Sequence, residues 1–140
     1  QDLDEVLRVL REELLVLRDA DPERLDTTLL ILPKVLADFF EFNQFLVECD
    51  QVLTELELDG VLQIADFHPR YQFAGADAND ISNCTNRAPY PTLHLLREAS
   101  IDKAVASFPD AADIFERNIA LLNEMGHEGW AALGVRARER

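Results

Sequence analysis

Apolar residues recur at helical spacing along three stretches of the chain, with charged residues between them. In residues 3–18, leucines and valines fall every three or four positions among arginines and glutamates, which predicts an amphipathic helix. A second stretch follows Pro33 and extends to Gly60. A third begins at Pro109 and reaches Gly126, a glycine suited to the position just after a helix. The pattern therefore predicts a helix-rich chain.

Two short apolar runs alternate with these helices, at residues 27–32 and 61–67. Each is bounded by turn-forming residues, and an unbroken apolar run of this length predicts a strand buried on both faces. The long helix expected between them is typical of a right-handed crossover joining parallel strands. The predicted fold class is therefore α/β and helix-rich, with a small, mostly parallel sheet covered by amphipathic helices.

The rest of the chain is expected to be a long loop and further helix. Small and polar residues dominate from Phe73 to Pro91, and loops of that length in a compact domain are commonly functional. A helix is predicted from Pro91, bending near Ser100. We expect one domain over residues 1–140. Since the helix at 3–18 leads into a strand, a strand is expected before it, so the sheet should have an open edge or an incomplete face.

Charge narrows the classes of partner. The net charge of -14 argues against nucleic acids and against anionic membrane surfaces, which need clustered lysine and arginine. No apolar run is long enough to span a bilayer. The two cysteines form no disulfide framework, so a soluble protein of a reducing cytoplasm is expected.

The chemically richest stretch is residues 66–102. Asp66 and His68 are two apart at the end of a predicted strand, so they should share a face, and the carboxylate could orient the imidazole as a general base. Arg70 and Tyr71 follow directly and suit a carboxylate or phosphate. These four residues are candidates for a small anionic ligand or substrate.

A second group of candidates enters the predicted helix at Pro91. Backbone N–H groups at a helix N-terminus attract anions, and no acidic residue occurs from Ile81 to Arg97. His94 and Arg97 should lie on one helix face with Glu98. We expect the guanidinium groups of Arg87 and Arg97 to turn toward one shared anion beside His68 and His94. The candidate ligand-binding residues here are Thr85, Asn86, Arg87, Tyr90 and Arg97, and His94 is a candidate catalytic residue.

Structural explanations compete with each of these roles. His68 before Pro69 is also typical of a turn. His94 lies among leucines, as a histidine at a core position does, and Arg97 could form an ion pair with a nearby carboxylate. Cys84 is a weak candidate nucleophile. Zinc held by both histidines with Cys84 or Asp66 is chemically allowed, but no pair has ligand spacing, so no metal is expected. The sequence identifies no cofactor.

Two segments, HPRYQFAG and TNRAPYPTLHLLREASIDKAV, resemble a bacterial family known as domain of unknown function 1415. The resemblance continues through FERNIALLNEMGHEGW and so covers almost the whole chain. It implies no activity. Members of the family have a longer N-terminus with a helix carrying a Cys-Pro-Phe motif and a further strand, and neither is present here. The resemblance points to the same residues of the 66–102 stretch.

Two functions are therefore open. The first is a site for a small anionic molecule, whether or not a reaction follows, and the second is a non-catalytic adaptor that docks a protein partner. An oligomer is compatible with both. Convergence of His68, Arg87, His94 and Arg97 in one cleft would favour the first, and their separation would favour the second.

Overall fold

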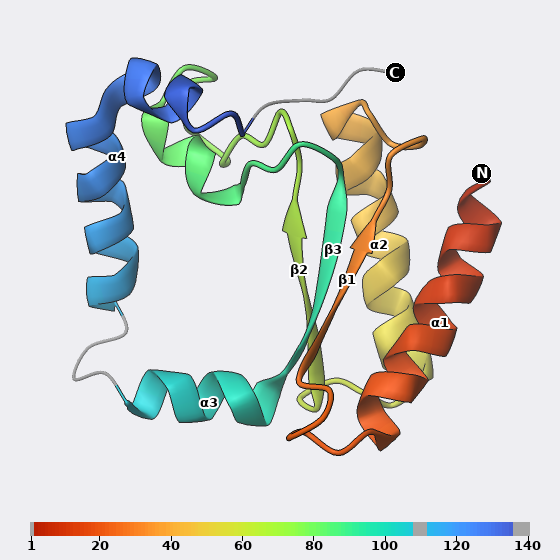
Figure 1. Cartoon of the computed structure of the whole chain (residues 1–140). Coiled ribbons are helices and arrows are strands. Elements are labelled where there is room, and N and C mark those ends of the chain that lie inside the picture. The colour runs from red at the N-terminus through yellow and green to blue at the C-terminus, as the bar shows by residue number, and fades with distance from the viewer. Residues whose placement is uncertain (1, 108–111, 136–140) are drawn as a thin grey trace.

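The computed structural model describes residues 2–107 and 112–135 (Figure 1). Its elements follow the chain in a simple order. They are α1 (Leu3–Asp19), β1 (Thr27–Ile31), α2 (Phe39–Glu55), β2 (Leu62–Phe67), the short 3-10 helix η1 (Ile81–Asn86), β3 (Thr92–Arg97), α3 (Glu98–Ala106) and α4 (Ala112–Ala132). The predicted helix at 3–18 and the predicted strands at 27–32 and 61–67 are confirmed as local elements.

The sheet is antiparallel throughout, so the predicted mostly parallel sheet is wrong. Its order is β1-β3-β2, and β3 pairs in antiparallel fashion with both neighbours. β1 and β2 run in the same direction, as a helical crossover requires, but β3 lies between them (Figure 1). The prediction failed because the third strand lies within a segment that was expected to be helical.

The segment Thr92–Arg97 alternates in burial as a strand does. Leu93, Leu95 and Arg97 are 0%, 0% and 9% exposed, whereas His94 and Leu96 on the other face are only partly buried. Helix α3 begins one residue later. On a strand, an odd spacing places side chains on opposite faces, so His94 and Arg97 cannot share a face. The helix N-terminus expected at Pro91 is therefore absent.

Helix α2 also begins later than expected. Residues 33–38 form turns, and Leu36 takes a φ of 60°, which lets its side chain reach the core. Asp38 then caps the helix by accepting hydrogen bonds from the backbone N–H groups of Phe40 (2.7 Å) and Glu41 (3.2 Å). The carbonyl of Leu36, three residues before α2, is hydrogen-bonded to the ring of His68. The start of α2 therefore lies close to the start of the 66–102 stretch.

Helices α1 and α2 cover one face of the sheet (Figure 1). The core between them consists of leucines from α1, aromatic and small apolar residues from α2, and the inward leucines of β3. Full burial of one such side chain contributes about 1.5–3 kcal/mol. The fully buried members are Leu10, Leu14, Leu17, Phe42, Phe45, Cys49, Leu93 and Leu95.

The opposite face of the sheet, here called the open face, carries no charged residue. Directly paired residues share a face, so the register assigns nine positions to it. Leu29 and Ile31 are 55% and 54% exposed, which contradicts the prediction that residues 27–32 are buried on both faces. The nine positions are Thr27, Leu29, Ile31, Gln63, Ala65, Phe67, Thr92, His94 and Leu96.

The C-terminal helices lie on the side of the sheet away from α1 and α2. α3 extends from the end of β3, and α4 packs on η1 through Leu122, which contacts a small cluster of Ile81, Cys84 and Trp130 (Figure 1). The residues assigned to α4 are two helical parts, because Gly126 (φ 69°, ψ 178°) is non-helical and ends the first part, as the sequence predicted. The predicted start at Pro109 lies outside the described residues.

Candidate functional site

The open face contains a hollow of about 460 Å³ at the end where β1 and β2 finish and β3 begins. Its walls are mostly apolar, and the rings of Phe67 and His94 lie 6.3 Å apart at its base. Ligand sites of this size typically combine apolar walls with a few polar groups. The lining residues are Leu29, Ile31, Phe67, Ala88, Pro89, Tyr90, Thr92 and His94.

The segment that precedes β3 forms one wall of the hollow. Pro89 and Pro91 restrict the backbone on both sides of Tyr90. The hydroxyl of Thr92 donates to the carbonyl of Tyr90 (2.9 Å), and the carbonyl of Pro91 accepts from the backbone N–H of Leu32 (2.9 Å). The wall is therefore tied to both β1 and β3.

His94 is the lining residue whose charge can change near neutral pH. It sits in the middle strand, opposite Leu29 on one side and Ala65 on the other. Partial burial among apolar neighbours lowers the pKa of the imidazole below its usual value. The imidazole ring is consequently mainly neutral at pH 7, and a bound acidic group would favour its protonation.

His68 lies on the other side of the sheet and is fully buried. Its Nδ1 accepts from the backbone N–H of Arg70 (3.0 Å), so the neutral ring carries its proton on Nε2 and donates it to the carbonyl of Leu36 (2.9 Å). The rings of Phe39 and Phe42 lie 5.2 Å and 5.0 Å away. These contacts connect the end of β2 to the start of α2.

Asp66 does not orient His68 in this arrangement, since both imidazole nitrogens have other partners. The carboxyl group lies on the helix-covered face, where burial, followed by the charge of Asp50, raises its pKa. Tyr71 packs against Phe39 and Phe73, with centroids 5.2 Å and 5.0 Å away. The expected grouping of Asp66 and His68 with the hollow is not formed.

Arg87 and Asn83 organise the loop that follows. The guanidinium of Arg87 donates to the carbonyls of Tyr71 (3.1 Å) and Ala78 (3.2 Å). The buried side-chain amide of Asn83 accepts from Phe73 N–H and donates to the carbonyl of Asp77. Both side chains thereby replace backbone pairing within an irregular segment.

Thr85 and Asn86 complete the attachment of η1. The hydroxyl of Thr85 donates to the carbonyl of Ser82 (2.9 Å), and the side-chain amide of Asn86 donates to the carbonyl of Asp66 (3.2 Å). Arg70, by contrast, is exposed. These candidate residues are therefore distributed around the loop and do not line the hollow.

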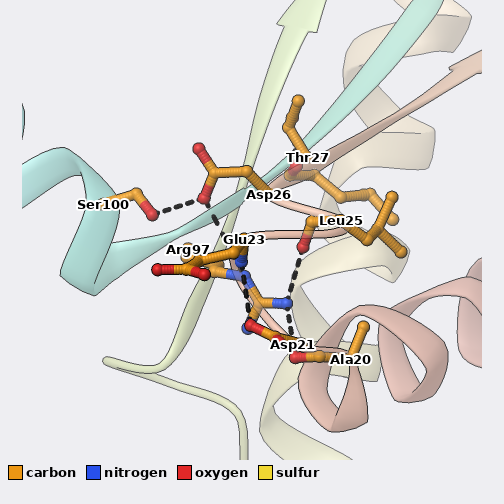
Figure 2. Close-up of polar contacts among 9 residues, drawn as sticks. Ala20, Asp21, Glu23, Leu25, Asp26, Thr27, Arg97 and Ser100 are labelled. Carbon is orange, nitrogen blue, oxygen red and sulfur yellow. Dashed lines mark hydrogen bonds and ion pairs between the residues drawn. The ribbon is translucent and has the colours of Figure 1, made fainter.

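Arg97 is the last residue of β3 and so lies at the end of the sheet opposite the hollow; Figure 2 shows its polar contacts. One of its terminal nitrogens donates to the carbonyls of Ala20 (3.0 Å) and Leu25 (2.8 Å), and Nε is 3.9 Å from the carboxylate of Asp26. Ser100 donates to the same carboxylate. Arg97 thus joins the α1–β1 connection to the β3–α3 junction and does not meet Arg87.

Of the predicted site residues, only Tyr90 and His94 line the hollow. The apolar residues Leu29, Ile31 and Phe67 were not predicted, although leucine and isoleucine at alternate positions are a signal for one shared strand face. Within residues 2–107 and 112–135, no three histidine, cysteine or acidic side chains are grouped as metal ligands. Burial raises the pKa of Cys84, while Arg87 acts in the opposite direction.

The fold and the hollow define a helix-rich protein with a small antiparallel sheet, one face of which is uncovered and uncharged. The chain belongs to the family described as protein of unknown function DUF1415, whose model matches residues 1–132. The comparisons with curated proteins and with solved structures found no match. In the described part of the chain, no helix has the length and apolar character needed to cross a membrane.

Proposed function

We propose that the protein binds a small, mainly apolar molecule with one acidic group in the hollow of the open face. The observation that carries this proposal is the composition of the hollow, in which apolar walls surround His94. Six of the eight lining residues belong to the 66–102 stretch, namely Phe67, Ala88, Pro89, Tyr90, Thr92 and His94. The proposal concerns binding alone.

A strongly charged ligand such as inorganic phosphate fits this site less well. Arg87 and Arg97 donate to backbone carbonyls elsewhere, and the hollow contains no arginine or lysine. A single carboxylate could pair with protonated His94 while the rest of the ligand displaces water from Phe67 and Ile31. Because burial lowers the pKa of His94, affinity should increase as the pH falls through and below 6.5.

Calorimetric titration with phenylacetate, 2-phenylethanol and inorganic phosphate at pH 5.5 and pH 8 tests this proposal. Phenylacetate should bind about tenfold more tightly at pH 5.5, whereas the neutral alcohol should show no such change. His94→Gln should remove the pH dependence, while His127→Gln, a change at an exposed histidine, should keep it. Equal affinities for phenylacetate at both pH values would contradict the role of His94, and preferential binding of phosphate would contradict an apolar site.

A protein partner is the second candidate, because exposed apolar side chains extend beyond the hollow. Phe115 and Leu121 of α4 are 53% and 55% exposed, in addition to Leu29 and Ile31 on the sheet. Large exposed apolar surfaces commonly mark interfaces. Absence of small-molecule binding, together with loss of a partner on Ile31→Asp, would favour this candidate. We also propose a cytoplasmic location, which the two free, buried cysteines support.

A further inference from the structure

A cleft of about 520 Å³ lies at the end of the sheet away from the hollow, between α3 and the connection from α1 to β1. Glu23 and Asp26 belong to the wall formed by that connection. The other wall is one face of α3, which includes Ser100 and Lys103 because residues three apart lie together on a helix. Arg97, at the junction of β3 and α3, completes the lining.

The carboxylate of Asp26 has acceptor capacity that the described residues leave unused. One of its oxygens accepts from the hydroxyl of Ser100 (2.5 Å) and lies 3.9 Å from Nε of Arg97 (Figure 2). The second distance is too long for a hydrogen bond, and the buried Nε has no hydrogen-bond partner. Arg97 therefore gives Asp26 a positive neighbour without occupying a lone pair of the carboxylate.

Two further charged side chains line the cleft, one on each wall. Glu23 comes from the connection between α1 and β1, and Lys103 comes from α3. Within the described part of the chain, neither side chain forms an ion pair or a hydrogen bond. One wall thus offers carboxylate acceptors, and the other offers an ammonium donor.

The formal charges of the lining residues cancel, because Glu23 and Asp26 balance Arg97 and Lys103. The cleft differs in this respect from the whole chain, whose net charge is -14. A simple anion would be repelled by the two carboxylates, and a simple cation would be repelled by the two basic groups. A ligand that carries one charge of each sign is complementary to both walls.

We propose that the cleft binds a free α-amino acid with a short apolar side chain. Its ammonium group donates to Glu23 and to the second oxygen of Asp26, and its carboxylate accepts from Lys103. Arg97 does not contact the amino acid, because its bonded terminal nitrogen donates to backbone carbonyls and its Nε is buried. Its role is to hold Asp26 in position as an ionised acceptor.

The uncharged part of the lining selects the side chain of the amino acid. Pro22, Ala99 and Ala104 offer small apolar surfaces, against which a short apolar side chain displaces water. Ligand sites commonly combine such surfaces with a few polar groups that fix orientation. The cleft shares no lining residue with the hollow, so this site does not depend on the ligand proposed there.

Amide chemical shifts measured by NMR during titration with L-valine test this proposal. Shifts at Ala99, Ser100 and Lys103 should saturate with a dissociation constant of about 1 mM. Valinamide lacks the carboxylate and N-acetylvaline lacks the ammonium group, so each should bind about tenfold more weakly through loss of a charge-assisted hydrogen bond. Equal affinity of the three compounds, or absence of saturable shifts at these residues, overturns the proposal.

Two variants at exposed side chains assign the charges of the ligand to the two walls. Lys103→Gln should weaken binding of valine about tenfold and leave valinamide unchanged, whereas Glu23→Gln should weaken valine and leave N-acetylvaline unchanged. Lys34→Gln and Glu48→Gln remove exposed charges outside the cleft and should leave the affinity for valine unchanged. Equal losses in these control variants would indicate a general effect of charge and would overturn the site.

Discussion

Buried polar side chains near the end of β2 act mainly as structural connections. His68 is the clearest example, because it is fully buried and both its ring nitrogens bond to backbone groups. Burial lowers its pKa, while the hydrogen bond to Leu36 acts in the opposite direction. A histidine that must remain neutral in the folded state links stability to pH.

The free energy of unfolding should fall as the pH drops below 6.5, the usual pKa of histidine. The unfolded state then binds a proton that buried His68 resists, so this contribution is complete above 6.5 and lost as the pH falls toward the lowered pKa. Urea unfolding between pH 5 and pH 8 measures it. His68→Gln should have a flatter profile, and exposed His127→Gln should retain the parent slope. Equal slopes for all three proteins would refute the assignment.

Arg97 should contribute to stability and not to anion binding. Arg97→Ala leaves the carbonyls of Ala20 and Leu25 without their donor, and the expected loss is about 2–3 kcal/mol. Arg70→Ala, at an exposed arginine, should change stability by less than about 0.5 kcal/mol. Thermal melts with and without phosphate provide the measurement. A phosphate-dependent rise in melting temperature that disappears in Arg97→Ala would contradict this role.

At the scale of elements, helix positions depend on capping as well as on apolar spacing. The apolar pattern after Pro33 predicted a helix from that point, but α2 starts at Phe39 because Asp38 supplies the cap. Similarly, Asp2 caps α1 by accepting from Glu5 N–H (2.8 Å). Residues 33–38 are then free to form the turn that places Leu36 against His68.

Asp38→Ala should destabilise the protein by about 1 kcal/mol, because two N–H groups at the start of α2 lose their acceptor. Asp38→Asn keeps an oxygen acceptor and should lose only a few tenths of a kcal/mol. Urea unfolding at pH 7 compares the two variants. If both lose the same amount, the negative charge at the helix N-terminus, and not the hydrogen bonds, is the source of the stabilisation.

At the scale of the whole molecule, the main feature is a sheet with one covered face and one uncovered face. α1 and α2 cover the first (Figure 1), and the strand register assigns nine uncharged positions to the second. An antiparallel sheet that faces water normally carries polar side chains on that face. The open face is uncharged although the chain has a net charge of -14, and this contrast is the reason why a binding function is proposed for the open face.

The double substitution of Leu29 and Ile31 by threonine should reduce binding of the apolar dye ANS without unfolding the protein. Both side chains are more than half exposed, so each should contribute less than about 1 kcal/mol to stability. ANS fluorescence and urea unfolding test the two parts separately. The fully buried Leu93 serves as a control, since Leu93→Thr should instead cost several kcal/mol. Unchanged ANS fluorescence in the double variant would show that the dye binds elsewhere.

The sequence by itself determined α1, the positions of β1 and β2, and the acidic character of the surface. Helical spacing in α1 and the mainly apolar runs of both strands, bounded by turn-forming residues, are signals carried by neighbouring residues along the chain. It also directed attention to residues 66–102, which provide most of the lining of the hollow. The family resemblance from the 68–75 and 85–105 segments is confirmed over residues 1–132.

Only the tertiary structure decided the identity of β3 and, with it, the location of the site. The segment TLHLLR fits both helical and strand spacing, and its insertion between β1 and β2 selects the strand because two ladders then satisfy its backbone. That choice places His94 on the open face and Arg97 on the covered one. Whether the candidate site residues lie together depends on which face of a strand each side chain occupies and on which strands pair. Neither can be read from the spacing of residues along the chain.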